Sequence, residues 1–322
     1  MQLNGDSFSS FAHLYDSFII DQWGVLHDGK VPYAGVTDCL QALKAAKKQL
    51  ILLSNSSKRK ASSASGLAKV GIDPAAFDQI VTSGELAWQM IYGRTFDFDL
   101  VGESSNDGVA APLPPLRVFV IGNNDDDADY VRSCNCVLAP PETAQFVLAR
   151  GTFCLAAGPT PGDTVAFSAA EDLVAAVGPW LDRCAARRLP MLVSNPDFHR
   201  PGSGAPMPGL VAKQYAEDKR GSVYYLGKPY VEVYNACFDA IRRHRGGALD
   251  KGRVVGVGDS LDHDILGAHR AGIASAWTAN GVHCGEMGVA EAAPALADDA
   301  VLQGMYERYA VRPTHTVPAF RW

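Results

Sequence analysis

Three acidic residues stand at or just after the ends of apolar runs and could together bind a metal ion. Asp21 closes the run Phe-Ile-Ile, and Asp259 closes the run Val-Val-Gly-Val-Gly. Asp264 follows in a segment where Ser260 is a good helix N-cap, so we expect it in the first helical turn, close to Asp259. Three neighbouring carboxylates repel one another unless a hard cation joins them, and oxygen ligands in this number suit Mg²⁺. The alternative, in which Asp262 and Asp264 only favour the N-terminus of a helix, explains one acid well and three poorly.

Asp21 is also a candidate nucleophile. A carboxylate at the end of a buried strand, followed at once by a turn with Gly24, can present an oxygen to a ligand. Such an oxygen could attack phosphorus while it binds a metal. Taken alone, Asp21 is better explained as a strand-terminating residue that caps a loop.

Two further motifs could bind a phosphoryl group. Ser54 and Asn55 end the run Leu-Ile-Leu-Leu, where a hydroxyl, an amide and the following backbone N–H groups can donate to phosphoryl oxygens. Lys228, between a glycine and a proline, could neutralise charge on the phosphate and on the nucleophile. Both motifs have ordinary alternatives, because Ser and Asn terminate many strands as turn formers and a lone lysine can lie in a surface turn.

Strands of a parallel sheet must position these side chains. Runs of four to six residues, rich in branched side chains and apolar on both faces, predict strands covered by helices. Helical spacing between them, as in 36–48, predicts an α/β fold. In such sheets ligands bind outside the carboxyl ends of the strands, which is where the polar residues stand. The predicted strands are 18–21, 50–55, 118–122, 191–195 and 254–259.

The middle of the chain has strand and helix patterns of its own. It separates the Ser54-Asn55 motif from the Lys228 motif. We therefore predict a core made of residues 1–83 and 222–322, with residues 84–221 as an inserted domain. A length of 322 residues fits two domains of ordinary size.

The composition places the chain among globular proteins and argues against two classes of partner. It is 47% hydrophobic and 20% charged, with a net charge of −6. This charge gives no electrostatic case for binding nucleic acid or an anionic membrane. No stretch of about 18 apolar residues and no secretory signal stands out, and the odd number of scattered cysteines does not suggest a disulfide framework. We expect a cytoplasmic protein.

The four motifs, in this order, resemble those of the haloacid dehalogenase superfamily. Their spacing and the insertion resemble its subclass IIA, which contains p-nitrophenyl phosphatases, pyridoxal phosphatase and nucleotide phosphatases. Val81-Thr-Ser-Gly84 and Ser194-Asn-Pro-Asp197 add to the likeness. The resemblance implies a Rossmann-like core with a parallel sheet and an inserted α/β cap domain of C2 type that selects the substrate. It also implies a Mg²⁺-dependent phosphatase that acts on a small phosphorylated metabolite.

Residue roles follow from the resemblance by position. Asp21 would be the nucleophile that forms a phosphoaspartyl intermediate, and Lys228 would clamp the phosphoryl group bound by Ser54 and Asn55. The cap would contribute substrate contacts from Asn195 and Asp197. A homodimer through the cap is a further expectation.

The metal site is implied in the same way. Mg²⁺ would be bound by Asp21, by Asp259, by the backbone carbonyl of Trp23, and by Asp264 directly or through water.

Trp23 departs from the pattern of the family's phosphatases. They carry a second aspartate there, which acts as general acid and then as general base, and an indole can do neither. His27 and Asp28 follow closely and are candidates to replace it. Dehalogenases and phosphonatases of the superfamily also lack an acid here, but a dehalogenase has no need of Asp259 and Asp264. The departure predicts a slow hydrolase biased to good leaving groups. The alternatives are cleavage of a C–P or acyl-phosphate bond, or a non-catalytic binding or regulatory protein.

Overall fold

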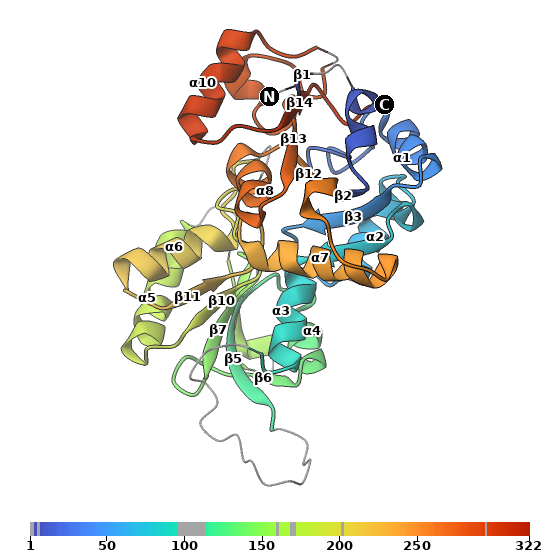
Figure 1. Cartoon of the computed structure of the whole chain (residues 1–322). Helices are drawn as coiled ribbons and strands as arrows, with labels where there is room; N and C mark the ends of the chain where they lie inside the picture. The colour runs from blue at the N-terminus through green and yellow to red at the C-terminus, as the bar shows by residue number, and fades with distance from the viewer. Residues whose placement is uncertain are drawn as a thin grey trace. The chain divides into compact units, whose positions relative to one another are not determined.

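The computed structural model describes residues 3–4, 7–95, 114–158, 161–167, 172–200, 203–293 and 295–322. Contacts along the chain divide it into two compact units. The first, which we call the core unit, comprises 1–54, 58–82 and 227–322. The second, the inserted unit, comprises 55–57 and 83–226. Figure 1 traces both units from the N-terminus in blue to the C-terminus in red.

The core unit is built on a seven-stranded sheet in the order β1-β14-β13-β12-β2-β3-β4. Every neighbouring pair is parallel. The predicted α/β class with a parallel sheet is therefore confirmed. The strands are β1 (Leu3–Asn4), β2 (Ser17–Ile20), β3 (Gln49–Ser54), β4 (Gln79–Thr82), β12 (Val254–Gly258), β13 (Ala274–Thr278) and β14 (His315–Val317).

Helices cover both faces of this sheet because alternate residues of its strands point to opposite sides. Phe18, Leu50 and Leu52 pack in one cluster with residues of α1 and α2. On the other face α7 contacts β3 and β4, and Gly256 of β12 lies against Ala268 of α8. The helices are α1 (Val36–Ala45), α2 (Lys60–Lys69), α7 (Val231–Arg245), a π-helix (Leu261–Ile265), α8 (Leu266–Ala271), α9 (Cys284–Met287) and α10 (Asp299–Tyr309).

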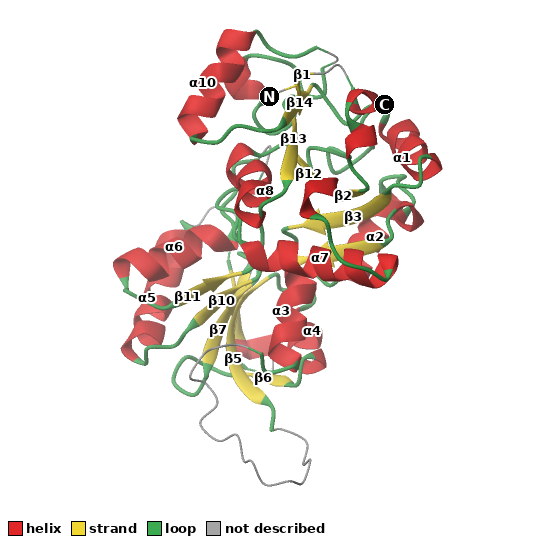
Figure 2. Cartoon of the chain, viewed as in Figure 1, coloured by secondary structure: helices red, strands yellow, loops and turns green. Residues whose placement is uncertain are grey.

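The inserted unit has its own sheet in the order β11-β10-β7-β5-β8-β9, with β6 paired to β5 (Figure 2). The pairs of β8 with β5 and β9 are antiparallel, and the others are parallel. Its strands are β5 (Leu116–Gly122), β6 (Cys136–Leu138), β7 (Phe146–Ala149), β8 (Cys154–Ala156), β9 (Thr164–Ala166), β10 (Met191–Val193) and β11 (Val223–Tyr225). Its helices are α3 (Ser83–Tyr92), α4 (Asp127–Ser133), α5 (Leu173–Ala186) and α6 (Pro208–Asp218).

The five predicted strands correspond to β2, β3, β5, β10 and β12. The predicted helix over 36–48 is shorter, because α1 ends at Ala45 and Lys47 adopts a left-handed conformation with φ of 55°. The seven cysteines are free thiols. Among the described residues, no helix has the length and apolar character needed to cross a membrane.

Candidate active site

The predicted acidic site lies at the carboxyl edge of the core sheet, where β12, β2 and β3 are neighbours. Val257 of β12 is in register with Ile20 of β2, which in turn is in register with Leu52 of β3. The Asp21 N–H donates to the Val257 carbonyl at 2.9 Å, which extends the ladder by one residue. Asp21 and Asp259 each follow the last residue of a strand, so the parallel register alone brings them to the same edge.

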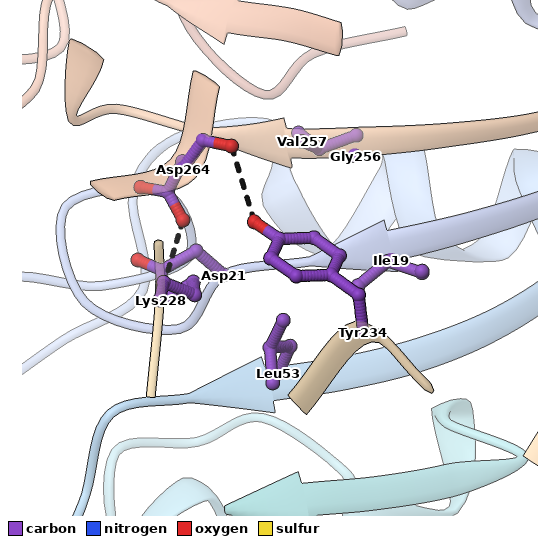
Figure 3. Close-up of a pocket in the computed structure, with 8 residues that line it drawn as sticks. All are labelled: Ile19, Asp21, Leu53, Lys228, Tyr234, Gly256, Val257 and Asp264. Carbon is purple, nitrogen blue, oxygen red and sulfur yellow. Dashed lines mark hydrogen bonds and ion pairs between the residues drawn. The ribbon is translucent and has the colours of Figure 1, made fainter. Parts of the chain in front are cut away.

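Lys228 lies between two of the acids (Figure 3). Its ammonium donates to the Asp21 carboxylate and, at 2.7 Å, to Asp264 Oδ1. Ligand oxygens of Asp21, Asp259 and Asp264 all lie within 4.8 Å of one another, and all three residues are buried. The structure thus brings together four of the residues predicted from the sequence.

The charges in this cluster do not balance. Burial raises the pKa of Asp21 to about 7 despite the opposing effect of Lys228. Burial, together with the carboxylates of Asp21 and Asp264, raises the pKa of Asp259 well above its usual value. Burial alone lowers the pKa of Lys228, but the two carboxylates that it contacts outweigh burial and raise it well above its usual value. The single ammonium of Lys228 thus lies among three acidic side chains, and two of these, Asp21 and Asp259, have a raised pKa.

Glycines and a backbone donor fix the Asp259 side chain. The Val282 N–H donates to Asp259 Oδ2 at 2.7 Å. A Cβ atom on Gly24 would lie 1.9 Å from Asp259 Oδ2, and one on Gly281 would lie 2.3 Å from Asp259 Cβ. Only residues without a side chain fit at these two positions. The Trp277 indole N–H donates to the Asp259 carbonyl at 2.8 Å.

Hydrogen bonds hold both the side chain and the backbone carbonyl of Asp264. The Ser260 N–H donates to Asp264 Oδ2 at 3.2 Å, and the predicted cap is confirmed because Ser260 Oγ accepts from the His263 N–H at the same distance. Tyr234 of α7 donates its hydroxyl to the Asp264 carbonyl at 3.1 Å (Figure 3). Tyr234 and Val282 were not predicted, since nothing in their local sequence marks them as neighbours of an acid.

The cluster fits a hard divalent cation. Three carboxylates supply only oxygen donors, and their spacing allows one ion to contact several of them. A cation would also offset the burial and the neighbouring carboxylates that raise the pKa of Asp21 and of Asp259. Asp21, Asp259 and Asp264 are the described residues that could hold it.

Ser54 ends β3 in the core unit, whereas Asn55 belongs by its contacts to the inserted unit. The Asn55 amide donates to Asp197 Oδ1 at 2.7 Å. Asn195, buried after β10, accepts the Asp197 N–H at 3.0 Å through its side-chain oxygen. The structure thus brings together three predicted substrate-contacting residues, and their role in binding substrate stays a prediction.

Trp23 is 43% exposed and packs edge-on against the His27 ring, with centroids 5.7 Å apart. His27 is part of the loop's own framework: its Nδ1 accepts the Gly29 N–H at 2.9 Å, and its Nε2 lies 3.1 Å from the Gln22 side-chain amide. Burial lowers the pKa of His27, so the ring is neutral at neutral pH.

Asp28 also serves the loop. Its carboxylate accepts the N–H groups of Val31 and Lys30 at 2.9 and 2.8 Å, and these bonds lower its pKa. An aspartate that is ionised at neutral pH has no proton to give to a leaving group. Both candidates for the missing acid therefore have a structural role in the loop after β2.

Comparison with family models decides the classification. A model described as haloacid dehalogenase-like hydrolase matches residues 18–136, and a second, described as HAD-hydrolase-like, matches residues 225–318. The two matches together span more than half of the chain. The chain belongs to the haloacid dehalogenase-like hydrolases. Its class is therefore that of a hydrolytic enzyme. A comparison with curated proteins finds no match.

Solved structures share the fold along nearly the whole chain. A haloacid dehalogenase-like hydrolase from Brucella suis 1330 is 23% identical over 98% of this chain and 99% of its own, with a TM-score of 0.73. A possible sugar phosphatase from Cytophaga hutchinsonii is 18% identical over 99% and 98%, with a TM-score of 0.70. A p-nitrophenyl phosphatase from Archaeoglobus fulgidus is 18% identical over 95% and 96%, with a TM-score of 0.63. These likenesses confirm the Rossmann-like core with a second sheet domain.

Proposed function

We propose that this haloacid dehalogenase-like hydrolase is a Mg²⁺-dependent phosphatase of small phosphorylated metabolites. The observation that carries the proposal is the buried cluster of three carboxylates around Lys228. The names of the solved neighbours, a p-nitrophenyl phosphatase and a possible sugar phosphatase, support the same reaction class.

Asp21 acts as the nucleophile in this proposal. One carboxylate oxygen attacks phosphorus, the bond to the leaving oxygen breaks, and a phosphoaspartyl group remains on Asp21. Water then hydrolyses this group and releases inorganic phosphate. Lys228, which already donates to Asp21, lies where it can neutralise charge on the transferred phosphoryl group.

Mg²⁺ held by Asp21, Asp259, Asp264 and the Trp23 carbonyl would stabilise negative charge on the phosphoryl oxygens. The Val282 N–H holds the Asp259 carboxylate, and two glycines leave room for it, before any ion arrives. Lys228 keeps Asp264 oriented toward the same point.

The phosphoryl group is bound further by Ser54 and Asn55. Residues 84–221 act as the cap domain that selects the substrate, with Asn195 and Asp197 contributing polar contacts. The hydrogen bond from Asn55 to Asp197 supports a shared role for these residues. A homodimer through the cap and a cytoplasmic location stay predictions.

The indole at position 23 sets the expected rate. It cannot protonate an alkoxide leaving group, and neither the neutral His27 ring nor the ionised Asp28 carries an acidic proton at neutral pH. Aryl phosphates, acyl phosphates and phosphoanhydrides leave readily as anions and depend least on an acid. We therefore propose a slow phosphatase that favours such substrates. The missing acid also supports the second candidate, a binding or regulatory protein that retains the phosphate and metal pocket.

Phosphate release from p-nitrophenyl phosphate and a panel of phosphorylated metabolites tests the proposal. We expect turnover that requires Mg²⁺, stops in excess chelator and is lost in Asp259→Asn. Full activity in chelator contradicts the metal's role. Binding of phosphorylated ligands without turnover in any substrate class selects the binding or regulatory alternative.

A further inference from the structure

We propose that His283, together with Glu286, is a positioning residue that holds the segment from Asp259 to Asp264 in its metal-binding conformation. This inference rests on the proposed role of the acids as Mg²⁺ ligands. The role of His283 follows from a hydrogen bond that joins the end of the core sheet to the midpoint of the acidic segment.

The acidic segment has a backbone donor that its own helix cannot satisfy. Asp264 and Ile265 donate their N–H groups to the Ser260 carbonyl, and His263 donates to Ser260 Oγ. The Leu261 N–H, at the start of the π-helix, has no carbonyl one turn before it to accept it. It donates instead to His283 Nε2 at 3.1 Å. A side chain 22 positions further along thus accepts this donor.

Glu286 determines which nitrogen of the imidazole can accept. His283 Nδ1 lies 2.7 Å from Glu286 Oε1. A carboxylate accepts and does not donate, so the ring proton is on Nδ1 and Nε2 is left with its lone pair facing Leu261. Burial raises the pKa of Glu286, but hydrogen bonds from His283 and Tyr309 and the Arg308 guanidinium outweigh it and keep the carboxylate ionised.

The surroundings of His283 leave it little freedom. Its side chain is 5% exposed, and its ring packs edge-on against Tyr309 at 4.7 Å between centroids and against Trp277 at 6.2 Å. Trp277 also donates to the Asp259 carbonyl. Val282, the residue before His283, donates its N–H to the Asp259 carboxylate. One short stretch after β13 therefore holds both the first acid and the middle of the segment.

The acids need such a restraint because one ion must contact several of them. Asp259 and Asp264 offer oxygens within 4.8 Å of each other, and a loose backbone between them would let that spacing change. The bond to Leu261 opposes such a change at a point between the two acids where the segment's own hydrogen bonds give no support. Removing this hydrogen bond should leave all three carboxylates present but less well aligned to contact one ion. Metal binding should therefore weaken.

Titration of metal-free protein with Mg²⁺ alone, followed by calorimetry, tests this role. We expect His283→Leu to weaken Mg²⁺ binding by about 10- to 100-fold. His283→Gln should recover most of the affinity, because its side-chain oxygen can accept from Leu261. His315→Leu is the matched control, since His315 is also buried in the core unit but bonds to the Tyr15 hydroxyl. It should leave Mg²⁺ affinity unchanged.

Glu286→Ala covers the case in which His283→Leu fails to fold, because Glu286 is 34% exposed and its truncation should disturb the core less. It releases the imidazole and should also weaken Mg²⁺ binding. Unchanged affinity in folded His283→Leu, or in Glu286→Ala, overturns the inference while the proposed phosphatase stands. An equal loss in His315→Leu overturns it as well, since the effect is then general. Absence of Mg²⁺ binding in the unaltered protein overturns the metal proposal and this inference together.

Discussion

Each unit buries a group of acidic side chains around one cation, but the two groups are balanced differently. In the core unit, three carboxylates face Lys228. In the inserted unit, Asp126 and Asp127 face Arg150, whose side chain is fully buried. The Arg150 guanidinium also lies 4.1 Å from the centre of the Tyr130 ring.

The inserted cluster is complete without a ligand. Asp127 accepts the backbone N–H groups of Asn123 and Asn124 at 3.1 and 2.7 Å in addition to Arg150. Asp126 is 33% exposed and remains partly hydrated. The core cluster has three acids around its one cation, and burial raises the pKa of Asp21 and of Asp259. A buried cluster whose acids are matched by donors stabilises a fold, whereas one that crowds three acids around a single cation is prepared for a metal ion.

Replacement of the nucleophile should have the largest effect. Asp21→Asn keeps the shape of the side chain but cannot form the phosphoaspartyl group, so we expect turnover of p-nitrophenyl phosphate to fall on the order of 10⁶-fold. Steady-state kinetics measure the loss, and near-UV circular dichroism confirms that the variant is folded. Substantial remaining turnover would place the nucleophile elsewhere and remove the distinction between the two clusters.

Breaking the inserted cluster should affect stability most. Arg150→Met leaves two acids without their cation, and loss of one partner of a buried ion pair costs about 3–5 kcal/mol of unfolding free energy. Arg183→Met is the matched control, because Arg183 pairs with Glu142 and lies over an aromatic ring in the same unit but is 40% exposed. Its cost should be within about 1 kcal/mol. Urea denaturation measures both. Equal costs would show that burial of Arg150 confers no special role.

Adding an acid to the core site should change substrate preference. Trp23→Asp supplies the missing carboxyl, and general acid catalysis contributes roughly 10²–10⁴-fold to the departure of a poor leaving group. We expect turnover of an alkyl phosphate to rise more than that of p-nitrophenyl phosphate. Trp23→Asn leaves the same space but supplies no acidic proton. It therefore separates the effect of the added acid from that of the lost indole. A similar gain in both variants, or an unaltered protein equally fast on alkyl and aryl phosphates, contradicts the proposal.

The last expected effect concerns pH. In chelator, burial raises the folded-state pKa of Asp21 to about 7, above its unfolded value, so the folded protein holds the proton more tightly. The stability that the protonated Asp21 carboxyl contributes is fully present below the pKa of Asp21 in the unfolded protein. It is lost as pH rises from that value through about 7. Asp21→Asn should therefore match the unaltered protein near pH 4 and become the more stable at pH 8. The gap should grow by at most about 1.4 kcal/mol per pH unit. Urea denaturation at several pH values measures the difference in unfolding free energy between the two proteins. A difference that does not change with pH contradicts the raised pKa of Asp21.

The sequence determined three neighbouring strands of the core, β12, β2 and β3, and the acids that follow two of them. Branched apolar runs that stop at Asp21 and Asp259 specify buried parallel strands locally, because side-chain pattern and strand period are properties of a few consecutive residues. Parallel pairing then puts all carboxyl ends on one edge. This is why the sequence alone groups Asp21 with Asp259, although the two stand near opposite ends of the chain.

The tertiary structure decided how those residues are held. Tyr234 and Val282 reach the acids, and His283 reaches Leu261 between them, from segments 22 to 30 positions away. Nothing in the sequence next to these three residues marks their partners. The same applies to Asn55, which follows a core strand and yet bonds to Asp197, 142 positions away. Such contacts depend on how finished elements pack, and packing is a property of the whole core. The sequence therefore predicts which residues carry the chemistry, and only packing determines which residues position them.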